Sequence, residues 1–161
     1  MSKSTTELGE LTAVALTKAW PHEPQDFTPW LRDNIAKLGD AIGMDLEVEG
    51  TEVSVGKFSA DLLCQEGGTG QRVVIENQYN KSDHDHLGKM LTYAAGLEAS
   101  TVVWVAERFQ DEHVAAIDWL NRVLGERDVM TGAEARFLPG ADDSLRRAFL
   151  AAVVERPLIE A

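Results

Sequence analysis

Two strand-like segments, each containing an acid towards its outer end, constrain this chain most. Residues 58–64 and 72–78 are rich in apolar residues, and a glycine-rich turn joins them. If the turn is centred near Gly68, an antiparallel hairpin places Asp61 opposite Glu76. Opposed side chains have Cβ atoms about 4.5–5.5 Å apart, and like charges there are destabilising. The hairpin therefore favours a positive charge between its two acids, and a divalent cation is the usual one.

The alternation of side chains along the strands brings a third polar residue towards these acids. Glu76 and Gln78 share one face of their strand, and Asn77 lies on the other. Asp61, Glu76 and Gln78 are therefore predicted to converge, and hard oxygen ligands of this kind suit Mg²⁺ or Mn²⁺. A solvated pair of strand-end acids is the alternative. The neighbouring apolar residues predict partial burial, which is costly for an unpaired acid, but these residues alone leave both interpretations open.

The segment after the hairpin predicts a helix from Ser82 or Asp83, as N-cap, to about residue 98. At 100° per residue, three polar side chains border its apolar stripe, where they can reach a strand-end site: His86, Lys89 and Tyr93. Each could equally be an ordinary residue at the edge of the core. A zinc site is not expected from the two neighbouring histidines, because residues two apart on a helix point in different directions.

The rest of the pattern predicts an α/β domain, a mixed sheet covered by helices. Thr28 is the expected N-cap of a helix that runs to about residue 41 and ends at Gly43. The other expected elements are a helix over 8–18, strand segments within 46–55 broken at 49–51, a buried strand over 101–106, a helix over 109–124, an edge strand over 134–138 and a helix over 143–154. We expect one compact domain with an N-terminal extension (1–27), a core (28–125) and a C-terminal strand and helix (126–161).

Bulk properties limit the function classes. A chain of 161 residues with 44% hydrophobic and 26% charged residues is typical of a globular protein. The single cysteine excludes an internal disulfide, and no apolar run reaches membrane-spanning length, so we expect a cytoplasmic protein. The formal net charge of −12 argues against strong non-specific binding to nucleic acid.

The ordered motifs resemble the PD-(D/E)XK nuclease superfamily, whose restriction-endonuclease-like core runs helix, three strands, helix, strand. Asp61 matches the first acid, and Glu76-Asn77-Gln78 matches the second motif in an E-x-Q form. Lys89 and Tyr93 fall where several members carry Q-x-x-x-Y. The chain also resembles, over roughly residues 8–124, a group of uncharacterised prokaryotic proteins of this fold, through segments such as 26–31, 83–88 and 119–121.

The resemblance implies a metal-dependent endonuclease that hydrolyses phosphodiester bonds in nucleic acid, DNA in the first instance. In that case Asp61 and Glu76 hold Mg²⁺ or Mn²⁺, together with the backbone carbonyl of Asn77. Gln78 and Lys89 position water and phosphate. The substrate-binding or supporting residues would be Glu52, His86, Tyr93 and Lys81.

Two departures from the family pattern matter. Gln78 stands where lysine is commoner, and Lys89 stands where glutamine is usual. The resemblance therefore leads to the hypothesis that a positive charge has moved from strand to helix. Glu52 could supply a third carboxylate, and Glu23 is a weaker candidate. The missing strand lysine and the net charge favour an alternative, a catalytically inactive nuclease-fold protein that binds or regulates. By analogy, a homodimer is also consistent with the resemblance.

Overall fold

A computed structural model describes residues 15–124, 130–138 and 147–152 of the chain. The helical elements are the 3₁₀ turn η1 (Leu16–Lys18), the π-helical turn η2 (Glu23–Phe27), α1 (Thr28–Asp33), α2 (Ile35–Ile42), α3 (His84–Gly96) and α4 (Asp111–Leu124). The strands are β1 (Leu46–Val55), β2 (Phe58–Glu66), β3 (Arg72–Lys81), β4 (Thr101–Arg108), β5 (Met130–Leu138) and β6 (Arg147–Ala152).

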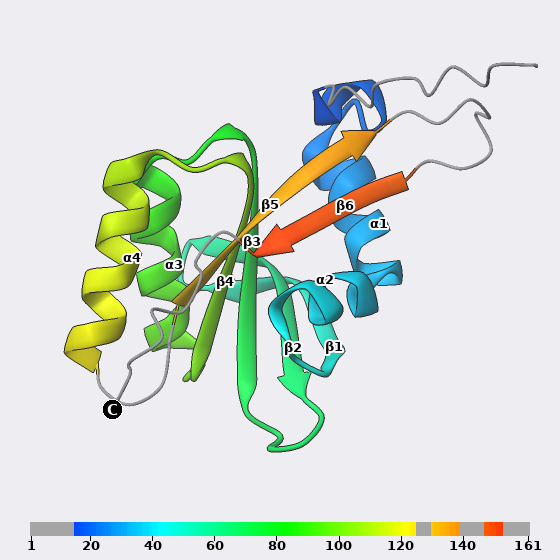
Figure 1. The fold of residues 1–161 in the computed structure, drawn as a ribbon. Coiled ribbons are helices and arrows are strands. Elements are labelled where there is room, and N and C mark those ends of the chain that lie inside the picture. The colour runs from blue at the N-terminus through cyan, green and yellow to red at the C-terminus, as the bar shows by residue number, and fades with distance from the viewer. Residues whose placement is uncertain (1–14, 125–129, 139–146, 153–161) are drawn as a thin grey trace, which may run out of the picture.

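The strands form one six-stranded sheet in the order β1-β2-β3-β4-β5-β6. β1, β2 and β3 run antiparallel, β3, β4 and β5 run parallel, and β6 is antiparallel to β5. α3 connects β3 to β4 and lies with α4 on one side of the sheet, whereas α1 and α2 lie on the other (Figure 1). The predicted α/β class, a mixed sheet flanked by helices, is confirmed.

Apolar side chains from both faces of the central strands build the core. Towards α1 and α2, Leu31 and Leu38 pack against Ile75 and Val103. Towards α3 and α4, the core contains Met90, Val102, Trp104, Ala106 and Ile117. The continuous apolar run in β4 therefore serves two faces, as predicted for a parallel strand covered on both sides.

The predicted hairpin and the start of its following helix are confirmed. The last paired residues of β2 and β3 are Leu62 and Ile75. One step further along this register, Asp61 lies opposite Glu76. Asp83 is the N-cap of α3, and its side chain accepts a hydrogen bond from the backbone N–H of His86.

The segment around Thr28 differs from the prediction. The chain is already helical from Glu23, and Thr28 does not cap a helix with its side chain. That side chain is buried and accepts a hydrogen bond from Asn77 Nδ2 at 3.0 Å. The expected single helix is divided at Asn34, whose ψ of 28° is not helical. A tertiary contact with β3 thus outweighs the local capping preference of threonine.

The first strand is also more continuous than its composition predicts. β1 passes through 49–51 with a bulge between Val48 and Gly50, and the reversal comes at Gly56, with φ of 59°. Pairing with β2 along most of the strand holds this segment extended despite its glycine.

The two ends of the described chain carry further corrections. β5 spans 130–138 and is not an edge strand, because β6 covers it. The predicted helix over 143–154 is wrong for 147–152, where pairing with β5 overrides the helix propensity of alanine and leucine. Within the predicted helix over 8–18, Leu16–Lys18 is a 3₁₀ turn, and residues 8–14 lie outside the described residues.

The segment assigned to an N-terminal extension contributes to the main core. Leu16, Trp20 and Phe27 are buried in the cluster that lies between the sheet and α1 and α2. None of the described helices is long and apolar enough to cross a membrane.

Candidate active site

The candidate site forms where β2 and β3 separate. Beyond the pair Leu62 and Ile75, carboxylates accept hydrogen bonds from the backbone N–H groups of β3 that face β2. Asn77 N donates to Asp61 Oδ2 at 2.7 Å, and Tyr79 N donates to Glu23 Oε2 at 2.7 Å. These side-chain acids thus accept the hydrogen bonds that a paired strand would otherwise accept, and they gather in the gap where β2 and β3 separate.

Asp61 and Glu76 form a tight acidic pair in this gap. Asp61 N donates a long hydrogen bond of 3.4 Å to Glu76 Oε2, and Glu76 is only 5% exposed. Burial raises the pKa of both carboxyls well above the usual range. Repulsion from Glu23 and Glu52 adds to the increase in the pKa of Asp61, and Asp61 itself adds to that of Glu76. The pair therefore favours a shared proton or a bound cation.

Helix α3 supplies the positive charges that act on the pair. The charge of Lys89 lowers the pKa of Glu76, and that of His86 lowers the pKa of Asp61, though burial outweighs both. Lys89 Nζ also forms an ion pair with Asp85 Oδ2 at 2.7 Å. Tyr93 is 1% exposed, and burial followed by the charge of Glu76 raises its pKa. The predicted polar trio of α3 borders the carboxylates.

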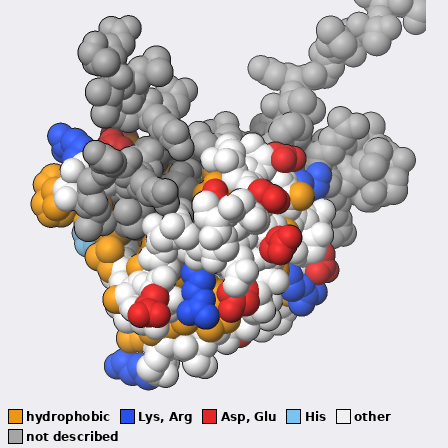
Figure 2. Space-filling view, turned by 90° about the horizontal axis from the view of Figure 1, so that it is seen from below, with side chains coloured by type: hydrophobic (Ala, Val, Ile, Leu, Met, Phe, Trp, Pro, Cys, Tyr) orange, Lys and Arg blue, Asp and Glu red, His pale blue; other side chains and the backbone are white. Residues whose placement is uncertain are grey.

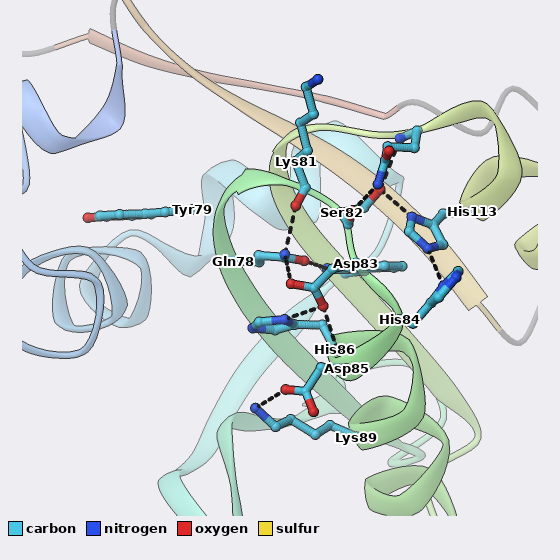
Figure 3. Close-up of polar contacts among 12 residues, drawn as sticks. Gln78, Tyr79, Lys81, Ser82, Asp83, His84, Asp85, His86, Lys89 and His113 are labelled. Atoms are coloured by element: carbon cyan, nitrogen blue, oxygen red, sulfur yellow. Dashed lines mark hydrogen bonds and ion pairs between the residues drawn. The ribbon is translucent and has the colours of Figure 1, made fainter.

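Gln78 does not point towards the acid pair, contrary to the prediction from strand alternation. Its Nε2 donates to Lys81 O at 2.7 Å and to Asp83 Oδ2 at 2.6 Å (Figure 3). Its Oε1 accepts from Trp104 Nε1 at 3.0 Å. The predicted convergence of Gln78 on the acid pair is therefore not observed, because its amide joins β3 to the cap of α3. The capping role of Asp83 was readable in the sequence, whereas no local signal reveals Trp104 as a partner.

Four other residues named as candidates from the sequence occupy distinct places. Asn77 directs its side chain to Thr28 on the opposite face, but its carbonyl lies on the same strand edge as its N–H. Glu52 is exposed and accepts from Ser59 Oγ at 3.2 Å. Glu23 was only a weak candidate from the sequence, but its negative charge raises the pKa of Asp61. Lys81 lies at the far end of β3.

The histidines at the start of α3 diverge, as expected from their spacing. His86 Nδ1 lies 2.9 Å from Asp83 Oδ1. His84 Nδ1 lies 2.8 Å from Nε2 of His113, whose Nδ1 lies 2.7 Å from Ser82 Oγ (Figure 3). Within the described part of the chain, no three His, Cys, Asp or Glu side chains are spaced as a metal cluster.

The residues in the gap between β2 and β3 fit a hard divalent cation without such a cluster. Mg²⁺ usually takes one or two carboxylates and keeps several waters. Asp61 and Glu76 each use one oxygen in the hydrogen bonds above, which leaves one oxygen on each carboxylate for a metal. The backbone carbonyl of Asn77 lies on the edge of β3 that borders this gap. The pKa values of both carboxyls are raised, and a bound cation would favour their charged forms.

The fold is similar to that of a solved nuclease. A crystal structure of a repair endonuclease from Pyrococcus abyssi aligns with a TM-score of 0.50 and 15% sequence identity, over 58% of this chain and 41% of that one. The EndoMS–dsDNA complex aligns with a TM-score of 0.49 and 13% identity, over 71% of this chain and 45% of that one. This chain thus matches less than half the length of either protein. The sequence matches no protein-family model and no curated protein.

Proposed function

We propose that this protein is a metal-dependent nuclease of the PD-(D/E)XK type, in an E-x-Q variant, that hydrolyses phosphodiester bonds in DNA. The observation that carries the proposal is the pair formed by the partly buried Asp61 and the buried Glu76 where β2 and β3 separate. The nuclease fold of the repair endonuclease supports it at the level of architecture.

The proposed roles follow from the geometry of the site. Asp61 and Glu76 hold Mg²⁺ or Mn²⁺, with the carbonyl of Asn77 as a third ligand. The ion, when bound, supplies an activated water and offsets negative charge on the phosphate. Lys89 adjoins Glu76 and provides the cation that Gln78 lacks. Its ion pair with Asp85 orients it from α3.

Two supporting roles belong to residues around the pair. Glu23 is the best-placed additional carboxylate, since Tyr79 N fixes its Oε2 beside β3. Gln78 is a positioning residue, because its contacts with Asp83 and Trp104 hold the end of β3 against α3. Neither Oε1 nor Nε2 of Gln78 is directed to the acids, so we assign it no contact with the scissile phosphate.

A cleavage panel tests the proposal. Single- and double-stranded DNA and RNA are incubated with the protein in Mg²⁺, in Mn²⁺ and in a chelator. We expect metal-dependent cleavage that Glu76→Gln abolishes and that Glu112→Gln, a substitution at an exposed position of α4, leaves unchanged. Cleavage that survives Glu76→Gln would identify a contaminating enzyme and count against the proposal.

A second candidate function is a nuclease-fold protein that binds metal or nucleic acid without cutting it. The engagement of both amide atoms of Gln78 by structural partners favours it. Titration calorimetry with Mg²⁺ separates the candidates when read beside the cleavage panel. Metal binding that Asp61→Asn removes, combined with no cleavage of any substrate, identifies the binding protein.

A further inference from the structure

The carboxyl-terminal ends of β3 and β4 carry two basic residues side by side. Lys81 and Arg108 are direct partners in the register of the two strands, and both are exposed. Neither forms an ion pair with an acid among the residues that the structure describes. Like charges at opposed positions of neighbouring strands are destabilising. A bound anion would relieve this repulsion.

A bulge in β3 sets the direction of Lys81. β3 pairs with β4 in regular register as far as Gln78, and the register then shifts so that Lys81 pairs with Arg108. Asn80, with a left-handed φ of 64°, lies within the shift. Strict alternation from Glu76 would place Lys81 on the opposite face of the sheet. The extra residue instead returns it to the face of Glu76, and bulges near active sites commonly re-aim a side chain in this way.

A cavity of about 580 Å³ adjoins the two cations. The acids that line it are already engaged. Glu107 accepts from Leu16 N at 2.5 Å and from Asn80 N at 2.8 Å, and Asp83 is bound by Gln78 and His86. In contrast, the Lys81 side chain extends away from this network, and only its backbone oxygen takes part in it (Figure 3). The carboxylate oxygens of the lining thus already accept hydrogen bonds from other groups, and Lys81 and Arg108 are the charged side chains of the lining that remain available to bind an anion.

We propose that Lys81 and Arg108 form a second anion site, which holds a backbone phosphate of the nucleic-acid strand whose cleavage is proposed above. The identity of the ligand rests on that proposed function. In β4, Trp104 is the partner of Glu76, and its distance to Arg108 along the strand is about 13 Å. At the rise of about 3.4 Å per nucleotide that a stacked strand has in duplex DNA, this distance corresponds to about four nucleotides from the cleaved bond.

The test measures binding with cleavage removed. In a Glu76→Gln background, fluorescence anisotropy follows the binding of a labelled 16-nucleotide single-stranded DNA over a range of salt concentrations. The Lys81→Ala/Arg108→Ala pair is compared with Lys37→Ala/Arg122→Ala, which removes the same charge from exposed positions on α2 and α4. Loss of two phosphate contacts is expected to reduce the slope of log K against log salt by about 1.4. The control pair is expected to keep the slope.

The outcomes separate this inference from the proposed function. If only the Lys81→Ala/Arg108→Ala pair reduces the slope and the native protein cleaves nothing, the anion site is supported and the cleavage proposal is contradicted. If the native protein cleaves and both variant pairs reduce the slope equally, the cleavage proposal is supported and the anion site is contradicted. No binding of the oligonucleotide by the Glu76→Gln protein overturns the site as well. Lys81→Arg/Arg108→Lys should restore the slope, because it keeps both charges.

Discussion

At the scale of single residues, Asp61 and Glu76 place two carboxyls close together with little solvent around them. Loss of solvation disfavours the charged form of both carboxyls, and repulsion between the two adds to this effect at Glu76. Hydrogen bonds from backbone N–H groups and the charges of His86 and Lys89 on α3 partly offset this effect. The raised pKa values of both carboxyls show that this compensation is incomplete.

The stability of the metal-free protein should therefore fall as pH rises. Because folding raises both carboxyl pKa values, the folded state binds more protons than the unfolded state above about pH 4. The free energy of unfolding should decrease between about pH 5 and about pH 8, the interval that leads to the raised pKa of Glu76. Urea unfolding across this interval measures it.

Glu76→Gln provides the control for that decrease. It removes one titrating group, so the pH dependence should flatten, and the variant should exceed the native protein in stability at about pH 8 by about 1–3 kcal/mol. Glu112→Gln should keep the native profile. A native profile that rises over the same interval would contradict the assignment.

A second residue-scale prediction concerns Trp104. Trp104→Phe removes the donor to Gln78 Oε1 and leaves a buried acceptor unpaired, at a cost of about 1–3 kcal/mol before any cavity is counted. Trp119→Phe changes the same side-chain type at a position that is 55% exposed, and it should cost less than about 0.5 kcal/mol. Denaturant unfolding compares the two. Equal losses would show that the hydrogen bond contributes nothing measurable.

At the scale of elements, the junction between β3 and α3 joins fold and site. Asp83 caps α3 through His86 N and binds Gln78 through its second oxygen. One carboxylate thus sets the direction of the helix that carries Lys89 and Tyr93, so the position of these side chains beside the acids depends on the cap.

Replacing the cap should therefore affect both stability and the site. Asp83→Ala is expected to cost about 1–2 kcal/mol from capping alone, with more from the unpaired Gln78 amide. Asp85→Ala, four residues before Lys89, breaks an ion pair whose acid is 73% exposed, and it should cost less than about 1 kcal/mol. Thermal unfolding distinguishes the two. A larger loss for Asp85→Ala would contradict this account of α3.

At the scale of the whole molecule, charge is unevenly arranged. The net charge is −12, and on the face shown in Figure 2 acidic and basic side chains are interspersed. Glu76 and the partly buried Asp61 and Glu23 instead gather where β2 and β3 separate, and Lys81 and Arg108 lie at the ends of β3 and β4. A cation bound by the acids would make this side of the molecule more favourable for a polyanion.

Metal binding should accordingly stabilise the folded molecule. Mg²⁺ at about ten times its dissociation constant adds about 1.4 kcal/mol to the free energy of unfolding if it binds the folded state alone. The increase should vanish in Asp61→Asn and persist in Glu52→Gln if Glu52 lies outside the ligand set. Thermal shift measurements at about pH 8, with Ca²⁺ for comparison, check this. Equal stabilisation of the native and Asp61→Asn proteins would contradict the assignment of Asp61 as a metal ligand.

Prediction from sequence succeeded where the signal is local or periodic. Alternation and turn composition are sufficient for the register of Asp61 and Glu76, and the 3.6-residue period is sufficient for the polar border of α3. It failed where residues far apart in the chain determine the hydrogen-bond partner or the secondary structure. Thr28 became a buried acceptor for Asn77, and residues 147–152 became a strand beside β5. Such contacts leave no local trace, since the partner is far away in the chain.

The sequence by itself determined the α/β class, the hairpin and its two opposed acids, because hydrophobic period and turn chemistry act over short distances. Only the tertiary structure decided which neighbours each polar group has. It turned Gln78 away from the acids to Asp83 and Trp104, moved Glu23 towards them, and used a bulge to bring Lys81 beside Arg108. Each of these outcomes depends on burial and hydrogen-bond satisfaction between elements that the chain brings together only on folding.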